Sequence, residues 1–170
     1  TLNTPGALSI IAELRKDFEG KLNIGAGTVC TLADLEKALA AGAQFIVSPI
    51  IEPSLMAACR EREIPFFPGA LTPSEIYQAS QAGARMVKVF PAGAMGPSYI
   101  KDVLAPLDQL LLMPTGGVTL KNIGEYWQAG ARAFGLGGNL FKKDLIQQAR
   151  WQELAGHFWR FKQALREAQK

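Results

Sequence analysis

Cysteine is scarce in this sequence, and no arrangement of residues suited to a metal ion is visible. Cys30 and Cys59 are the only cysteines, and neither lies in a Cys-x-x-Cys pair or near the single histidine at metal-ligand spacing. We therefore expect no metal, and two reduced thiols of the kind found in cytoplasmic proteins. No apolar run approaches the ~18 residues of a membrane span. No signal-peptide pattern is present either, so a membrane partner is not expected.

Charge of one sign is not in excess. The 18 Lys and Arg residues and the 15 Asp and Glu residues leave a net charge of +3, and the basic residues are scattered along the chain. This balance gives no reason to expect a nucleic-acid partner. Hydrophobic residues make up 48% and charged residues 19% of the sequence, as in an ordinary globular protein. We expect residues 1–170 to form a single domain.

A repeating unit of roughly 20 to 25 residues dominates the sequence and predicts βα units with a parallel sheet. In each unit a short apolar run ends in Gly, Pro or Ser, a helical segment follows, and a glycine turn leads to the next run. The six expected strands cover residues 22–29, 45–48, 64–67, 86–90, 110–113 and 133–136. The expected helices cover residues 5–19, 32–41, 53–62, 73–81, 97–104, 120–129 and the tail beyond residue 140.

The number of units indicates the architecture. A closed (β/α)8 TIM barrel has eight units and typically ~250 residues. Six units and a leading helix fit an α/β barrel of this kind that lacks the first βα unit and most of the second strand in this chain. Residues 1–4 would then be the end of one more strand. A flavodoxin-like open sheet also fits the alternation, but a phosphate-site pattern at the last two strand ends favours the barrel.

Lys88 is the strongest candidate for a catalytic residue. It lies inside the expected strand 86–90, on one face with Met86 and Phe90. Because both faces of a barrel strand are covered, an ammonium group there is costly, and we expect a lowered pKa for Lys88. A neutral amine can attack a ketone to form an iminium. A purely structural role is also open, that of an edge-strand lysine that blocks aggregation, but the neighbouring motifs favour the functional reading.

Two glycine turns follow the last two expected strands. They are Thr115-Gly116-Gly117-Val118 and Gly135-Leu136-Gly137-Gly138-Asn139. Glycine lets backbone N–H groups approach a ligand closely, and groups of such N–H donors bind anions. Phosphate sites of barrels are commonly built after strands seven and eight. Each turn alone could be purely steric, but together they predict a phosphate site.

The remaining polar residues near strand ends give weaker signals. Thr28 ends the turn Gly25-Ala26-Gly27-Thr28, where its hydroxyl could bind a carboxylate or simply cap a tight turn. Glu52 and Glu75 follow strand ends, but acidic residues are common at helix starts. His157 is expected to be a surface or packing residue, far from the strand ends. Packing, or else a subunit contact, is also expected for an apolar stripe on the last helix: Trp151, Leu154, Phe158, Phe161 and Leu165.

In order and spacing, the motifs resemble one known family. The similarity depends on Ile24-Gly25-Ala26-Gly27-Thr28-Val29, Val47-Ser48-Pro49, Phe67-Pro68-Gly69, Val87-Lys88-Val89-Phe90-Pro91-Ala92, Pro114-Thr115-Gly116-Gly117-Val118 and Gly135-Leu136-Gly137-Gly138. From Thr1 to at least Phe141, the chain resembles the 2-keto-3-deoxy-6-phosphogluconate (KDPG) aldolases, which include 4-hydroxy-2-oxoglutarate (KHG) aldolases.

The resemblance implies a class I aldolase, which is a carbon–carbon lyase of carbohydrate metabolism in the Entner–Doudoroff route. Such an enzyme is a homotrimeric TIM barrel that needs no metal or cofactor. It cleaves the phosphorylated oxo-acid KDPG to pyruvate and glyceraldehyde 3-phosphate, or KHG to pyruvate and glyoxylate. Lys88 matches the Schiff-base lysine. The implied substrate-binding residues are Thr28, Pro49 and Phe90 at pyruvate, Thr115, and, at the phosphate, Gly116, Gly117, Gly138 and Asn139, the last where many members carry Ser.

Departures from the family pattern leave the substrate open. The family's general acid/base glutamate would lie two residues before Thr1, just upstream of this chain. Asn3 stands where many members carry an arginine. The pattern around Asn3 resembles the branch that acts on 2-keto-3-deoxy-6-phosphogalactonate, whereas Thr115 is typical of the gluconate branch.

Two further kinds of protein are compatible with the sequence. One is a truncated, catalytically weak barrel that binds a phosphorylated ligand. The second is another phosphate-binding barrel, such as an epimerase or a thiamine-phosphate synthase-like enzyme. Such enzymes share the paired glycine turns but do not need a lysine within Val87-Lys88-Val89-Phe90-Pro91.

Overall fold

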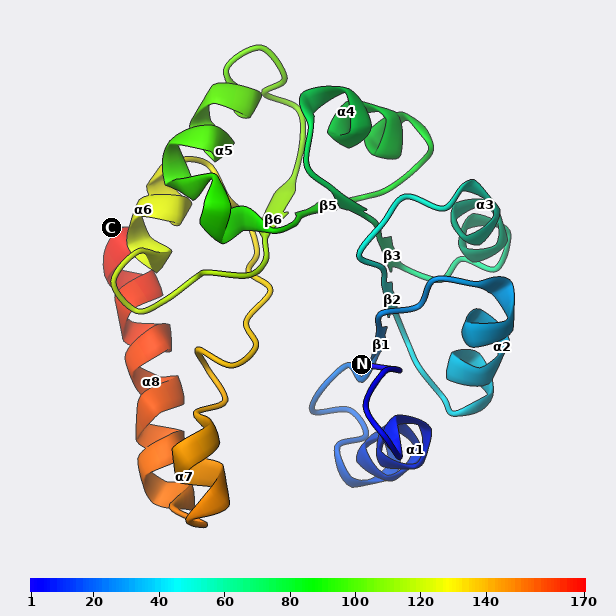
Figure 1. Cartoon of the computed structure of the whole chain (residues 1–170), viewed down its shortest axis with the longest axis vertical. Helices are drawn as coiled ribbons and strands as arrows, with labels where there is room; N and C mark the ends of the chain where they lie inside the picture. The colour runs from blue at the N-terminus through cyan, green and yellow to red at the C-terminus, as the bar shows by residue number, and fades with distance from the viewer. The chain divides into compact units, whose positions relative to one another are not determined.

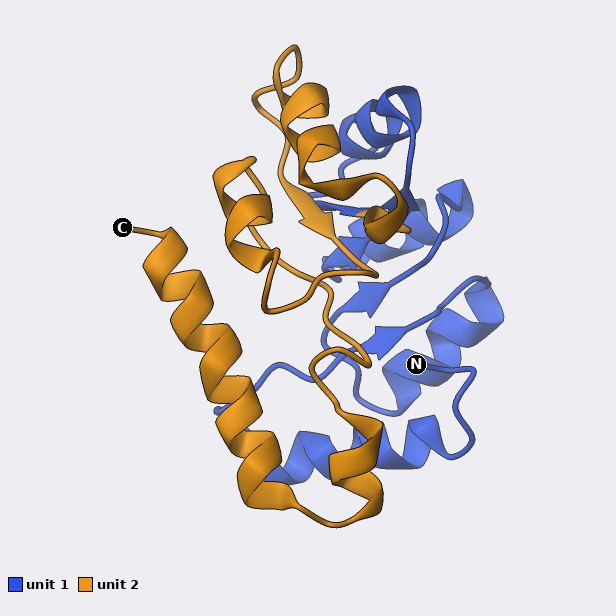
Figure 2. Cartoon of the chain, turned by 60° about the vertical axis from the view of Figure 1, so that its left-hand side comes forward, with its two compact units in different colours: residues 1–88 blue, residues 89–170 orange.

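Short parallel strands alternate with helices along the chain (Figure 1). The computed structural model describes residues 1–170, which form two compact units, Thr1–Lys88 and Val89–Lys170, coloured separately in Figure 2. The α/β fold with parallel strands that the repeating pattern predicts is therefore confirmed. None of the helices combines the length and the apolar character that crossing a membrane would require.

The first unit is built on three paired strands, β1 (Ala26–Gly27), β2 (Ile46–Val47) and β3 (Phe66–Phe67), which run parallel in that order. Helices α2 (Leu32–Ala40) and α3 (Pro53–Glu61) lie along one side of this sheet (Figure 1). Each buries a leucine completely, Leu35 and Leu55 respectively, so each turns its apolar face inward. The unit also contains α1 (Ala7–Asp17), β4 (Gly69–Ala70), α4 (Pro73–Gln81) and the first two residues of β5 (Val87–Val89).

Local capping explains why these helices begin where they do. Thr31 caps α2 by accepting a hydrogen bond from the Asp34 N–H group at 3.1 Å. At α4, Thr72 and Glu75 form a reciprocal capping box and Pro73 occupies the first turn. The helix predicted over residues 73–81 matches α4 at both ends.

The second unit continues from Val89, the last residue of β5. The Thr115 N–H group, directly after β6 (Leu112–Pro114), donates to the Val89 carbonyl at 2.9 Å, and Thr115 also forms a parallel bridge with Gly135. The unit then contains a short 3-10 helix, Ala92–Ala94, and the helices α5 (Gly96–Leu104), α6 (Ile123–Gln128), α7 (Lys143–Gln147) and α8 (Trp151–Ala168), the last being the long orange helix of Figure 2.

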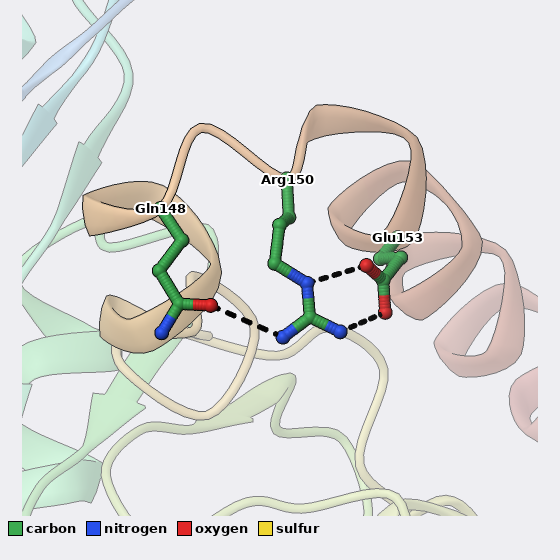
Figure 3. A network of polar contacts seen from close by, with 3 residues as sticks. All are labelled: Gln148, Arg150 and Glu153. Carbon is green, nitrogen blue, oxygen red and sulfur yellow. Dashed lines mark hydrogen bonds and ion pairs between the residues drawn. The ribbon is translucent and has the colours of Figure 1, made fainter.

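An exposed polar network holds the turn between α7 and α8 (Figure 3). Arg150 directly precedes α8 and donates to both carboxylate oxygens of Glu153 in its first turn. A third bond runs from Arg150 to the Gln148 side-chain oxygen at 3.3 Å. Between them, Ala149 has a left-handed backbone with a φ of 52°. One guanidinium group thus links the end of α7 to the start of α8.

The strands are shorter than predicted. In the expected strand 22–29 only β1 forms. Before it, the Ile24 carbonyl accepts a bond from the Gln44 N–H group at 2.7 Å, but the Ile24 N–H group donates to the Gln44 side chain at 2.8 Å instead of to a strand backbone. The expected strand 133–136 is reduced to the single bridge at Gly135. Residues 1–4 form a turn, although the Leu2 N–H group does donate to the Gly27 carbonyl at 2.8 Å. Strand β4 was not predicted.

Two helical predictions also need correction. The helix expected from residue 120 begins at Ile123. Residues 120–122 form a turn that leads into it, in which the Asn122 side chain accepts a hydrogen bond from the Thr119 N–H group at 2.7 Å. The tail divides into α7 and α8. Trp151, expected in the packing stripe, is 59% exposed, since the buried face of α8 carries His157 beside Leu154 and Phe161.

Candidate active site

The Lys88 side chain is buried. It is 9% exposed, and Val87 and Val89, on the opposite face of β5, are at most 1% exposed, so both faces of β5 are covered, as expected. Burial lowers the pKa of Lys88 below that of an ordinary lysine, and the electrostatic interaction with Cys30 opposes this effect. A lowered pKa leaves more of the amine neutral near physiological pH, which is what nucleophilic attack on a carbonyl requires.

Thr28 follows β1 in a strained conformation. Its φ of 59° lies in the left-handed region, which a β-branched residue rarely adopts. Backbone strain of this kind is concentrated at functional sites. The next residue, Val29, donates its N–H group to the Val47 carbonyl at 3.3 Å. Thr28 and Pro49 therefore follow the ends of two adjacent parallel strands.

Pro49 packs against Gly69, in the segment that pairs with Lys88. A Cβ atom on Gly69 would overlap the Pro49 backbone, so only glycine permits this close approach. The residue before Gly69, Pro68, accepts a hydrogen bond from the Lys88 N–H group at 2.8 Å. Three of the predicted site residues are thus brought to neighbouring strand ends within the first unit. We call this set, together with Cys30, the Lys88 cluster: Thr28, Cys30, Pro49 and Lys88.

Cys30 was missed as a member of this cluster by sequence reasoning, which treated both cysteines only as reduced thiols. Cys30 lies within electrostatic range of the Lys88 amine, since it affects the Lys88 pKa. Cys30 is half-buried and is not in a disulfide. Nothing in the spacing of the cysteines indicated this proximity, because Cys30 and Lys88 are brought together only by the pairing of strands.

The first glycine turn needs glycine for reasons internal to the fold. Gly116 and Gly117 have φ values of 81° and 82°, in the left-handed region. A Cβ atom on Gly117 would also overlap the Gly93 backbone, and one on Gly116 would meet the Phe90 ring at 3.5 Å. Phe90 therefore lies over this turn, with 39% of its surface exposed.

The second glycine turn is different. Gly137 and Gly138 have no positive φ, and a Cβ atom on either would meet nothing within 4 Å. Gly135, in contrast, lies so close to Thr115 that a Cβ atom would overlap the threonine side chain. Local sterics therefore explain Gly135, but not Gly137 and Gly138. Glycine at these two positions leaves the backbone open to a ligand.

The two turns lie next to each other and present free donors. The Asn139 side-chain amide donates to the Val118 carbonyl at 2.9 Å. No acceptor in the chain receives the backbone N–H groups of Gly116, Gly117, Gly138 or Asn139. Several free backbone donors at adjacent turns are suited to an anion. We call this set the glycine-turn cluster, and all of its members belong to the second unit: Phe90, Thr115, Gly116, Gly117, Gly138 and Asn139.

His157 contradicts one expectation and meets another. It is 5% exposed, as a packing residue should be. However, it is not remote from the strand ends, because its Nε2 atom lies 2.8 Å from the Asn139 carbonyl oxygen. The prediction failed because spacing along the chain does not reveal that α8 folds back beside the second glycine turn.

Neither of the two acidic candidates is free for proton transfer. Glu52 accepts hydrogen bonds from the Ser54 hydroxyl and N–H groups, and Glu75 accepts them from the N–H groups of Leu71 and Thr72. These bonds lower the pKa of both carboxyl groups. Both side chains cap helices, which is the structural role that acidic residues at helix starts commonly have. No group of three or more His, Cys, Asp or Glu residues is placed to hold a metal ion.

Comparison with known proteins extends these observations. The family described as KDPG and KHG aldolase matches residues 1–156. A probable 2-dehydro-3-deoxy-6-phosphogalactonate aldolase of Rhizobium meliloti is 37% identical over 142 residues, which are 83% of this chain and 67% of the relative. A 2-dehydro-3-deoxy-phosphogluconate aldolase of Treponema pallidum is 39% identical over 140 residues, which are 82% of this chain and 66% of the relative. The chain thus spans about two thirds of the length of these curated relatives.

A solved structure shows the same architecture. KDPG aldolase from Legionella pneumophila, with pyruvate captured at low pH as a covalent carbinolamine intermediate, has a TM-score of 0.82 and 30% identity. The alignment covers 96% of this chain and 77% of that protein. The match to an aldolase family also speaks against an epimerase or a thiamine-phosphate synthase-like enzyme.

Proposed function

The chain belongs to the KDPG and KHG aldolase family, and from this premise we propose that the protein is a class I aldolase whose nucleophile is Lys88. The observation that carries the proposal is the burial of the Lys88 amine in β5, with the lowered pKa that follows from it. The relative from Legionella pneumophila, with its covalent carbinolamine of pyruvate, supports the same chemistry. The protein releases pyruvate and an aldehyde from a 4-hydroxy-2-oxo-acid.

The reaction starts when the neutral Lys88 amine attacks the C2 ketone. The carbinolamine loses water and becomes an iminium ion. The C3–C4 bond then breaks, its electron pair moves toward the iminium nitrogen, and the C4 hydroxyl proton passes to a general base. By the family resemblance this base is a glutamate just before Thr1, and such a group typically contributes ~10²–10⁴-fold. The enamine takes a proton at C3, and water releases pyruvate and the free amine.

The remaining members of the Lys88 cluster would bind the pyruvate portion, and the family resemblance assigns the same role to Phe90. The Thr28 hydroxyl is suited to the substrate carboxylate, and the surrounding structure keeps Thr28 in its left-handed conformation. Pro49 shapes the neighbouring strand end, where Gly69 packs against it. Because the iminium itself accepts the electron pair, the mechanism needs no metal or cofactor.

The glycine-turn cluster would bind the substrate phosphate. Support comes from the free N–H groups of Gly116, Gly117, Gly138 and Asn139, and from the open space at Gly138. Thr115 joins the two strand ends through its bridge with Gly135. A phosphate has several acceptor oxygens, so it can satisfy a group of backbone donors that the fold leaves free.

We further propose a (β/α)8 barrel, assembled as a trimer, for the whole protein. The alternating parallel units support the barrel, and the family resemblance supports both the barrel and the trimer. A cytoplasmic location stays a prediction. The substrate is KDPG, its galactonate isomer or KHG. Thr115 favours KDPG and the pattern around Asn3 favours the galactonate isomer, and both of these substrates occur among the names of the relatives.

The test is pyruvate release measured by coupling to lactate dehydrogenase. We expect the protein to act on KDPG, its galactonate isomer or KHG, and the ratios of kcat/KM values to identify the preferred substrate. Lys88→Arg should lower kcat by about 10³-fold or more, because a guanidinium cannot form the iminium. Activity retained in Lys88→Arg would contradict the proposal.

A further inference from the structure

The second glycine turn is supported from behind by α8. The carbonyl of Asn139 can only accept a hydrogen bond, so His157 donates to it from Nε2, at 2.8 Å. The other ring nitrogen, Nδ1, lies 3.3 Å from an Arg160 guanidinium nitrogen. A guanidinium can only donate, so Nδ1 accepts this bond and the proton of the ring is on Nε2. Both nitrogens are therefore used, and the direction of the bond to Asn139 is fixed.

The imidazole ring is held rigidly in this position. His157 is 5% exposed, and its ring packs edge-to-face on Phe161 with the centroids 5.2 Å apart. Leu154, one turn earlier on α8, is 8% exposed. Apolar packing thus restricts the ring, and the hydrogen bond from Nε2 to the Asn139 carbonyl connects the ring to the turn.

Asn139 passes this restraint on to the first glycine turn. Its carbonyl is held by His157, while its side-chain amide donates to the Val118 carbonyl at 2.9 Å. Val118 directly follows Gly116 and Gly117. One residue therefore fixes the spacing of the two turns whose backbone N–H groups are free. A shift of Asn139 would move its own N–H donor and that of Gly138 away from a shared anion.

We propose that His157 is a positioning residue for substrate phosphate, which sets the free backbone donors of the second glycine turn through Asn139. The inference rests on the proposed function, since it takes the anion to be the phosphate of the substrate. It assigns a role to a residue beyond the part of the chain that the family match covers, which ends at residue 156. His157 contacts the Asn139 carbonyl rather than the free N–H groups, so it acts without touching the ligand.

The experiment compares two aldehydes in the direction of aldol addition, with pyruvate as the common partner. Glyceraldehyde 3-phosphate carries the phosphate and glyoxylate does not. His157→Leu removes the donor and keeps an apolar side chain, whereas His157→Gln keeps an N–H donor at a similar distance. Leu154→Ala is the matched control, because it weakens the packing of the same helix face without removing a hydrogen bond to the turn. Melting temperatures are measured for all variants.

We expect His157→Leu to raise the KM for glyceraldehyde 3-phosphate about fivefold, the effect of losing one hydrogen bond, and to leave the KM for glyoxylate unchanged. His157→Gln should stay close to the unaltered protein, and Leu154→Ala should lower the melting temperature without a selective change in KM. Equal KM changes for both aldehydes, or none, would overturn the positioning role while leaving the aldolase assignment intact. Failure of the unaltered protein to form a pyruvate adduct at Lys88 would overturn the proposed function itself.

Discussion

At the scale of single residues, the burial of Lys88 benefits reactivity at the expense of stability. Burial disfavours the charged form of the amine, so the pKa of Lys88 is lower in the folded protein than in the unfolded chain. Between the lowered pKa of the native state and the ordinary lysine value of the unfolded chain, the unfolded state binds more protons. Folding stability therefore rises with pH across this window, and below the window the full cost of the buried charge is present.

Lys88→Met should therefore stabilise the protein at neutral pH. Removing a buried ammonium group is expected to contribute about 1 kcal/mol, which corresponds to about 2–4 °C in melting temperature. The gain should shrink as the pH rises toward that of an ordinary lysine, because the unaltered side chain then becomes neutral. Calorimetry at a series of pH values checks this. A stabilisation that does not depend on pH would show that charge is not the cause.

The two glycine turns give a second residue-scale prediction, because they need glycine for different reasons. Gly117→Ala should destabilise the protein by about 2–5 kcal/mol, since alanine adds left-handed strain and an overlap with Gly93. Gly138→Ala should change stability by less than about 0.5 kcal/mol, since the added methyl group meets nothing.

Gly138→Ala, although nearly neutral for stability, should impair the binding of phosphorylated substrate. Gly138→Ala places a methyl group in the space proposed for the phosphate, so we expect a raised KM for phosphorylated substrate and an unchanged KM for glyoxylate in the addition reaction. Denaturant titration and steady-state kinetics on both variants provide the comparison. If Gly138→Ala binds phosphorylated substrate normally, the phosphate lies elsewhere.

At the scale of helices and strands, the junction of α7 and α8 carries a prediction of its own (Figure 3). The Arg150 guanidinium lowers the pKa of the Glu153 carboxyl group. The interaction therefore stabilises the fold above the ordinary pKa of glutamate and is lost as the pH falls through the lowered value. Both side chains are exposed, so solvent and salt weaken the pair.

Arg150→Ala should accordingly produce a small drop in melting temperature at neutral pH. The drop should disappear in acid, where Glu153 is protonated, and should be reduced in about 0.5 M salt. Arg62→Ala, which breaks the exposed pair with Glu36 elsewhere in the chain, is the matched control. A loss of stability that is as large in acid as at neutral pH would mean that the Arg150 side chain acts through packing.

Elements with local signals were predictable from the sequence, and the rest were not. The capping box at Thr72 and Glu75 fixes α4, and the prediction matches its bounds. Strand lengths depend on partners distant in the sequence, so the substitution of the Gln44 side chain for a backbone partner at Ile24 could not be foreseen. The turn at residues 120–122, which directly precedes α6, involves the Asn122 side chain and could not be foreseen either.

The candidate site was predictable to a similar extent. The burial of Lys88 follows from its strand position and is observed, whereas the left-handed backbone of Gly116 and Gly117 was not predicted. The nearness of Cys30 to Lys88 and of His157 to Asn139 required the tertiary fold. Spacing along the chain carried no signal for either contact.

At the scale of the whole molecule, the family match shows that the protein is related to aldolases. The two clusters indicate which residues would bind and cleave the substrate. The Lys88 cluster supplies a buried amine, and the glycine-turn cluster supplies backbone donors that the fold leaves free. The central claim is that one lysine, among all the lysines of the chain, forms the covalent bond.

Borohydride trapping tests this claim most directly. The protein is incubated with pyruvate, reduced with sodium borohydride, digested and analysed by mass spectrometry, with Lys88→Arg as the control. We predict a pyruvate-derived mass on the peptide that contains Lys88, on no other lysine, and none in the control. An adduct on a different lysine, or no adduct at all, would contradict the account.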